Sequence, residues 1–176
     1  TGRPHLFYFN GQLGRTEQLR NYSFGLRQQL HRLFGGPEHA ADGIIVTDAR
    51  TARYGAMLSS SKFCGVLPGW GWSGRMEDAV LHGCIPVIIM DGVHMPFEGV
   101  LDYEAFALRV AEADVEKLDE LLRAVPQERR QAMRDAMGAL WSRFTYARAL
   151  IEPDAWLPRP ELPRDHLDVP PLPALA

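Results

Sequence analysis

Short runs of apolar residues alternate along this chain with longer segments whose apolar residues recur at helical spacing. The runs lack the polar–apolar alternation of a half-exposed strand, so they predict strands buried on both faces. The predicted strands are residues 5–9, 43–47, 63–68, 86–90 and 106–110. The predicted helices are residues 15–34, 51–60, 74–83, 115–125 and 127–146. This order predicts an α/β fold, a Rossmann-like parallel sheet with helices on both faces.

The composition changes after residue 150. Proline becomes frequent there, at Pro153, Pro158, Pro160, Pro163, Pro170, Pro171 and Pro173. Proline-rich segments favour extended or disordered chain over packed elements. We therefore expect residues 1–150 to form one domain and residues 151–176 to form a Pro-rich, extended or disordered C-terminal tail.

Charge and hydropathy narrow the classes of function. The chain has 176 residues, 46% of them hydrophobic, and a formal net charge of -3. The negative charge disfavours a nucleic-acid or anionic-membrane surface, and no apolar run approaches the roughly 18 residues of a transmembrane helix. The chain opens on a predicted strand without an initiator Met, so we expect it to be a piece of a longer protein.

A glycine-rich turn, "LPGWGWSGR", follows the third predicted strand. Gly69, Gly71 and Gly74 would let the backbone approach a ligand closely and can adopt positive φ. Ser73 is placed to cap the following helix, whose N–H groups would suit an anion such as a diphosphate. The alternative is that Ser73 only caps and the glycines only turn the chain.

Three polar residues share one face of the helix after this turn, at spacing i, i+3 and i+7: Arg75, Asp78 and His82. A cation in the first turn opposes the helix dipole, which indicates a role toward an anion. An ordinary surface ion pair between Arg75 and Asp78 is the alternative. The turn fits neither the Rossmann G-x-G-x-x-G motif nor a Walker loop, which disfavours a nicotinamide dehydrogenase or an NTPase.

At this point the sequence shows a family resemblance. The segment "SKFCGVLPGWGWSGRMEDAVLHGCIPVIIMDGVHMPFEGVLDYEAFALRVAEADVEKL" resembles the C-terminal half of exostosin-type glycosyltransferases, in the form found in plants and green algae. The shared pattern is Phe-Cys, a Gly-rich turn, Ser-x-Arg, an acid three residues after the Arg, and Gly-Cys-Ile-Pro-Val-Ile. These enzymes have a GT-B architecture, with the active site between two Rossmann-like domains, so the resemblance implies that this chain is the C-terminal half.

The resemblance implies roles for the residues around the turn. Tyr54 matches a tyrosine that holds the uridine of the donor, and Arg75 matches the arginine that contacts the diphosphate. Asp78 stands where the family usually has Glu, the residue that holds the ribose hydroxyls. The Asp side chain is one methylene shorter than that of Glu, and the neighbouring Glu77 is the alternative ribose ligand.

Further residues complete the expected nucleotide-sugar site. Arg15 resembles an arginine at the cleft-facing end of the first strand. Ser73, Gly69 and Gly71 would lie along the phosphates. Trp70 and Trp72 would either line the cleft or pack back on the domain.

The implied reaction is inverting transfer of a sugar from a UDP-sugar to a glycan or glycoprotein. We expect no cofactor and no metal, because Arg75 and the turn amides would stabilise the departing UDP and the histidines lack metal-ligand spacing. The general base is expected in a missing N-terminal domain of the same protein. The full-length form would lie in the Golgi lumen as a type II membrane protein, held only by an N-terminal anchor absent from this chain.

Other functions remain open at this stage. A non-catalytic nucleotide-sugar- or glycan-binding module, or an inactive truncated product, is the main alternative. A flavodoxin-like or receiver-type regulatory domain suits the same fold, but the chain has no acidic cluster after its first strand.

The chain has two cysteines, Cys64 and Cys84. A strand and the helix that returns beside it bring these positions close together, and the Golgi lumen implied by the resemblance permits a disulfide. The alternative is two small buried thiols.

An acidic pair, Glu112 and Asp114, precedes the predicted helix at 115–125. Such a pair holds a metal in GT-A glycosyltransferases. We favour Asp114 as the N-cap of that helix.

Overall fold

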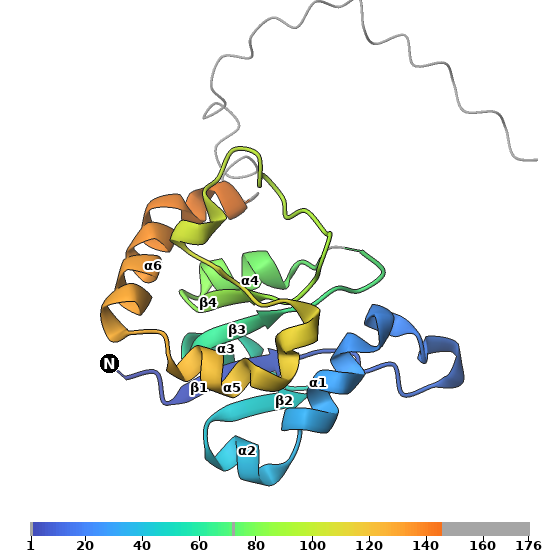
Figure 1. The fold of residues 1–176 in the computed structure, drawn as a ribbon. Helices are drawn as coiled ribbons and strands as arrows, with labels where there is room; N and C mark the ends of the chain where they lie inside the picture. Colours follow the sequence, from blue (N-terminus) through green and yellow to red (C-terminus); the bar gives the residue numbers. More distant parts are fainter. Residues whose placement is uncertain (1, 72, 146–176) are drawn as a thin grey trace, which may run out of the picture. The chain divides into compact units, whose positions relative to one another are not determined.

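The computed structural model describes residues 2–71 and 73–145. Its centre is a five-stranded sheet in which every neighbouring pair of strands is parallel, in the order β2-β1-β3-β4-β5 (Figure 1). The strands are β1 (His5–Asn10), β2 (Ile44–Thr47), β3 (Ser61–Val66), β4 (Ile85–Ile88) and β5 (Leu108–Arg109). The predicted α/β class with a parallel sheet is confirmed.

Helices connect the strands and follow the last one (Figure 1). The α-helices are α1 (Leu26–Phe34), α2 (Pro37–Ala41), α3 (Tyr54–Ser59), α4 (Arg75–Leu81), α5 (Leu118–Arg123) and α6 (Gln127–Leu140). Short 3₁₀ helices are η1 (Glu17–Leu19), η2 (Tyr22–Gly25), η3 (Tyr103–Ala105), η4 (Glu112–Lys117) and η5 (Trp141–Phe144).

The sheet is covered on both faces, as the continuous apolar strands predict. Phe7 and Phe9 of β1 belong to the main core, together with Leu26 and Leu30 of α1. Tyr8 points to the opposite face and packs in a second cluster, whose other fully buried members are Leu58, Cys64, Ala79 and Cys84. Successive residues of a strand point to opposite faces, so β1 is buried by helices on each side.

The helix predicted over residues 15–34 is only half correct. Its second half is α1, whereas the first half forms η1 and η2. Ser23, Phe24 and Gly25 have positive φ angles of 59°, 54° and 82°. Left-handed residues cannot continue a right-handed helix, so α1 begins after Gly25.

Asp114 does not cap a helix. The 3₁₀ helix η4 begins at Glu112, three residues before the predicted start at residue 115, and the Asp114 carboxylate pairs with Lys117 at 2.8 Å. The Glu112 carboxylate instead accepts a hydrogen bond from the Asp91 N–H at 3.0 Å. This bond joins the segments that follow β4 and β5.

The described residues up to Phe144 form one compact unit. No helix in residues 2–71 and 73–145 is long and apolar enough to cross a membrane. The predicted Pro-rich tail, residues 151–176, lies outside the described residues.

Candidate functional site

The strands β1, β2 and β3 are neighbours in the sheet, so their carboxyl ends lie side by side. In a sheet of order 2-1-3-4-5, ligands bind at the point between β1 and β3 where the strand order reverses. A hollow of about 360 Å³ opens at these carboxyl ends, lined by Asn10, Gly11, Gln12, Asp48, Ala49, Arg50, Thr51 and Tyr54. The fold therefore places the predicted site residues around the position where such sheets bind ligands.

Arg75, the first residue of α4, reaches across to the end of β1. Its Nε and Nη2 atoms donate hydrogen bonds to the Asn10 carbonyl oxygen at 3.0 and 2.9 Å. Its guanidinium also lies over the Phe9 ring, with Cζ 5.2 Å from the ring centroid. The predicted diphosphate-binding arginine is thus held at the β1 end, and none of the ion pairs among the described residues involves it.

Gly11 makes room for this guanidinium. A Cβ atom at position 11 would lie 2.8 Å from Arg75 Cζ and 3.3 Å from Arg27 Nη1. Contacts below about 3 Å do not occur for a real Cβ, so any larger residue would push Arg75 away. The glycine that the site requires is therefore in the loop after β1.

Arg27 is the main site residue that the sequence reasoning missed. Its side chain is 1% exposed, and its Nη2 and Nη1 atoms donate to the carbonyls of Leu67 at 3.1 Å and Gln12 at 3.3 Å. Its Cζ lies 4.8 Å from the Tyr22 ring centroid and 5.4 Å from that of Phe9. Arg27 and Arg75 therefore share the Phe9 ring.

The environment of Arg27 disfavours its positive charge. Burial lowers its pKa to about 10, with the nearby charge of Arg75 as a second cause. Its Nε has no hydrogen-bond partner among the described residues. The sequence carries a signal for this residue, since Arg27, Leu30 and Phe34 fall on one helix face, and a cation on a buried face marks a special position.

Tyr54 and Asp78, the two residues predicted to hold the nucleoside, contact each other. The Tyr54 hydroxyl donates a hydrogen bond to Asp78 Oδ2 at 3.1 Å. The pKa of Tyr54 is raised, first by burial and then by the Asp78 carboxylate. Tyr54 also lines the hollow, and Asp78 is joined to it by this hydrogen bond.

Glu77 points elsewhere. Neighbouring residues on a helix point about 100° apart, and the charge of Glu77 acts on Tyr103, whose pKa is raised by burial and then by Glu77. Burial also raises the pKa of Glu77, and its Oε2 atom has no partner among the described residues. The geometry favours Asp78 over Glu77 beside Tyr54.

The glycine-rich turn differs from the expectation in two respects. Gly69, Gly71 and Gly74 are all absent from the positive-φ positions of the described backbone. The N-cap of α4 is Gly74, and Ser73 lies one residue earlier with its Oγ buried and unpartnered among the described residues. With only seven residues, α4 also contributes a weak dipole.

The outer part of this turn carries an aromatic residue. The Trp70 side chain is 66% exposed and stands edge-on to Tyr22, with ring centroids 5.6 Å apart. The candidate Trp72 lies outside the described residues. Trp70 therefore faces solvent beside Tyr22, whose ring also contacts Arg27, rather than packing into the core.

Arg15 lies in the loop after β1, as the resemblance implies. Its Nε and Nη2 atoms donate to both carboxylate oxygens of Asp48, at 2.5 and 2.9 Å. Asp48 lines the hollow, so Arg15 lies at its rim with its charge already paired.

Cys64 of β3 and Cys84, which precedes β4, form a disulfide with a Cα–Cα distance of 5.8 Å. The structure thus agrees with the predicted disulfide and not with two buried thiols. The bond ties β3 to the end of the segment that carries Arg75 and Asp78.

Residues 2–71 and 73–145 contain no group of three or more His, Cys, Asp or Glu side chains placed to hold a metal ion.

Comparison with known proteins places this geometry in a family. A family model described as the Exostosin GT47 domain matches residues 1–125. A probable glucuronoxylan glucuronosyltransferase of Arabidopsis thaliana is 36% identical over 107 residues, which cover 60% of this chain and 23% of that protein.

Two further relatives agree. A probable glucuronosyltransferase of Oryza sativa subsp. japonica is 47% identical over 80 residues, covering 43% of this chain and 19% of that protein. A probable beta-1,4-xylosyltransferase of Arabidopsis thaliana is 42% identical over 85 residues, covering 48% and 20%. The chain spans about a fifth of the length of the curated relatives it matches. The resemblance seen in the sequence is confirmed, and the chain belongs to the exostosin GT47 family.

Proposed function

We propose that this chain is the donor-binding part of an inverting glycosyltransferase that uses a UDP-sugar and transfers the sugar to a glycan or glycoprotein. Residues 1–150 would form the nucleotide-sugar-binding domain of a two-domain protein. The observation that carries the proposal is the pair Arg27 and Arg75 at the end of β1, next to Gly11.

The two arginines form a site for a doubly charged anion. They share the Phe9 ring, and none of the ion pairs among the described residues involves either of them. Two neighbouring cations repel unless an anion lies between them, and a guanidinium fits phosphate oxygens bidentately. A diphosphate would relieve the repulsion that contributes to the lowered pKa of Arg27.

The nucleoside would occupy the hollow at the ends of β1 and β2. Tyr54 supplies an aromatic wall and Asp78 a carboxylate, joined by their hydrogen bond of 3.1 Å. A carboxylate accepts hydrogen bonds from the two ribose hydroxyls. The turn at Gly69, Gly71 and Ser73 would border the phosphates, with Ser73 Oγ as an unused hydrogen-bonding group.

The chemistry follows from these roles. The acceptor hydroxyl oxygen would form a bond to the anomeric carbon while the bond from that carbon to the phosphate oxygen breaks. Arg27 and Arg75 would stabilise the charge that develops on UDP. A base would take the hydroxyl proton, and we assign both this base and the acceptor site to another domain of the whole protein.

The disulfide bears on the cellular location of the whole protein. The disulfide between Cys64 and Cys84 requires an oxidising compartment. We place the whole protein in the Golgi lumen, held by an N-terminal membrane anchor outside this chain.

Calorimetric titration with UDP and with uridine tests the proposal. UDP should bind in EDTA as well as in Mg²⁺, and Arg75→Gln should weaken UDP by about tenfold or more while leaving uridine within about twofold. Arg20→Gln, a surface cation paired with Glu17, is the matched control and should change neither. Equal binding of UDP by Arg75→Gln and the parent chain would refute the diphosphate assignment.

A further inference from the structure

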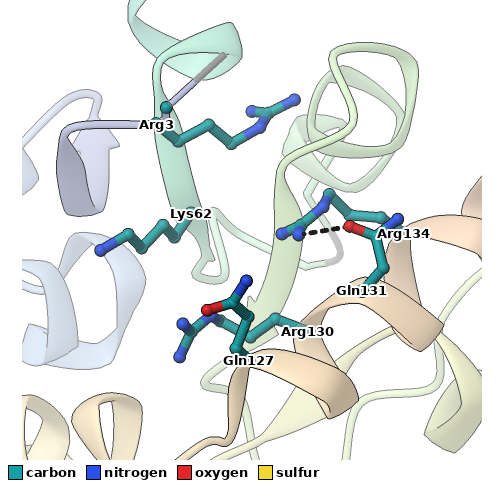
Figure 2. Close-up of a pocket in the computed structure, with 7 residues that line it drawn as sticks. Arg3, Lys62, Gln127, Arg130, Gln131 and Arg134 are labelled. Atoms are coloured by element: carbon teal, nitrogen blue, oxygen red, sulfur yellow. Dashed lines mark hydrogen bonds between the residues drawn. The ribbon is translucent and has the colours of Figure 1, made fainter.

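A second pocket lies at the opposite ends of the strands from the donor site. It has a volume of about 680 Å³, and its lining side chains include Arg3, Lys62, Gln127, Arg130, Gln131 and Arg134 (Figure 2). Arg3 precedes β1 and Lys62 is the second residue of β3, so this basic pocket lies at the amino ends of these strands. One strand length, about 20 Å, separates it from Arg75.

The charge of the basic pocket contrasts with that of the chain. Of the residues that the structure describes, four cations and no carboxylate line it, although the chain has a net charge of -3. Some cations elsewhere pair with carboxylates, as in Arg20–Glu17, Arg123–Asp119 and Lys117–Asp114. None of the ion pairs among the described residues involves a cation of the basic pocket.

Hydrogen bonds hold two of the arginine side chains of the basic pocket in place. Arg3 donates hydrogen bonds to the carbonyls of Leu58, Ser61 and His82, at 3.0, 2.8 and 2.8 Å. Arg134 donates to Gln131 Oε1 at 2.9 Å. The pKa of Arg3 is lowered first by burial and then by the charge of Arg134, because the two guanidinium groups lie near each other.

The arrangement of these groups selects among anions. Figure 2 shows the charged ends of Arg3, Lys62, Arg130 and Arg134 spread along the pocket rather than meeting at one point. Spread charges suit several separated anionic groups better than one phosphate ion. Gln127 and Gln131 offer both donors and acceptors, which suits sugar hydroxyls. Among residues 2–71 and 73–145, no aromatic ring lines the pocket to stack on a nucleotide base, and no large apolar residue lines it to enter a membrane.

We propose that the basic pocket binds an acidic saccharide, a sugar chain whose residues carry carboxylates, at a site separate from the donor site. The cations would pair with the carboxylates, and the glutamine amides would bind the hydroxyls between them. Binding would weaken with added salt, because the charged groups remain partly exposed.

Titration of the 176-residue chain with a tetramer of galacturonic acid tests this proposal. The double variant Arg130→Gln/Arg134→Gln should weaken binding by about tenfold or more. Arg20→Gln/Arg123→Gln removes the same charge outside the pocket and should change binding by less than about twofold. A neutral tetramer of xylose should not bind at the basic pocket, and Arg75→Gln should leave binding of the acidic tetramer unchanged.

Several results would overturn the proposal. Equal weakening by the control pair would show that only net charge matters. Displacement of the tetramer by an equal concentration of inorganic phosphate would show a simple anion site, and displacement by UDP would place the tetramer in the donor site. If thermal unfolding shows that the Arg130→Gln/Arg134→Gln chain does not fold, Lys62→Gln, which alters an isolated side chain of β3, must weaken binding in its place.

Discussion

The lack of a side chain at Gly11 leaves room for the Arg75 guanidinium, because a Cβ atom on Gly11 would lie 2.8 Å from the Cζ atom of Arg75. The two residues are far apart in sequence but meet at the end of β1, where Arg75 binds the Asn10 carbonyl. The close approach links the loop after β1 to the helix after β3, the two segments that flank the reversal in strand order.

Gly11→Ala should therefore displace the Arg75 guanidinium without unfolding the chain, because the clash falls on the end of a flexible side chain. We expect UDP affinity to fall by about tenfold and uridine affinity to stay within about twofold. Gly99→Ala is the control, since nothing lies within 4 Å of a Cβ at that position. If Gly11→Ala bound UDP as the parent does, the position of Arg75 would not matter for the ligand.

The Tyr54–Asp78 pair should act on the nucleoside rather than on the phosphates. Asp78→Asn replaces a charged acceptor by a neutral amide, and it should weaken UDP and uridine alike by about 1–3 kcal/mol. Titration of both ligands against the same variant gives the comparison. A loss confined to UDP would move Asp78 from the ribose to the phosphate region.

Arg27 makes stability depend on pH in a specific direction. Its pKa is lowered to about 10 in the folded chain, below the ordinary value of an arginine, so the unfolded state binds the proton more tightly. This contribution therefore disfavours folding at neutral pH and becomes less unfavourable as pH rises through 10. Between pH 7 and pH 10.5, the free energy of unfolding of the parent should rise relative to Arg27→Met by on the order of 1 kcal/mol.

Urea unfolding of both chains across this range measures the difference, in which the other titrating groups cancel. As the pH rises, the free energy of unfolding of the parent should increase relative to that of Arg27→Met. A constant difference would mean that Arg27 keeps its ordinary pKa in the folded chain.

The disulfide between Cys64 and Cys84 closes a loop with a sequence separation of 20. Its loss should lower the free energy of unfolding by about 3 kcal/mol in the chain-entropy account. Urea unfolding with and without a reductant measures the loss. The double variant Cys64→Ala/Cys84→Ala should show no response to the reductant, and a response of similar size in that variant would assign the effect to something other than the bond.

The sheet could be predicted because its strands are continuous apolar runs, and such runs are buried wherever they occur in a parallel sheet. The helix boundary near Gly25 could not, because the apolar spacing continues through Tyr22 while the left-handed φ angles of Ser23 and Phe24 depend on tertiary packing. A local pattern does not reveal such conformations.

The residues of the candidate site, too, could be predicted only in part. Arg75, Tyr54 and Asp78 were found through the motif after β3 and its family resemblance, and the structure brings them to one edge of the sheet. Arg27 was missed because the helix pattern around it indicates only burial. Its closeness to Arg75 depends on how the loop after β1 folds against α1, which a sequence without a structure does not reveal.

A crystal structure of this chain with UDP tests the central claim most directly. The account predicts that both phosphates lie within hydrogen-bond distance of the Arg75 and Arg27 guanidinium groups, with the ribose against Asp78 and Tyr54. UDP bound at another edge of the sheet, or bound here with its phosphates directed away from both arginines, would contradict it.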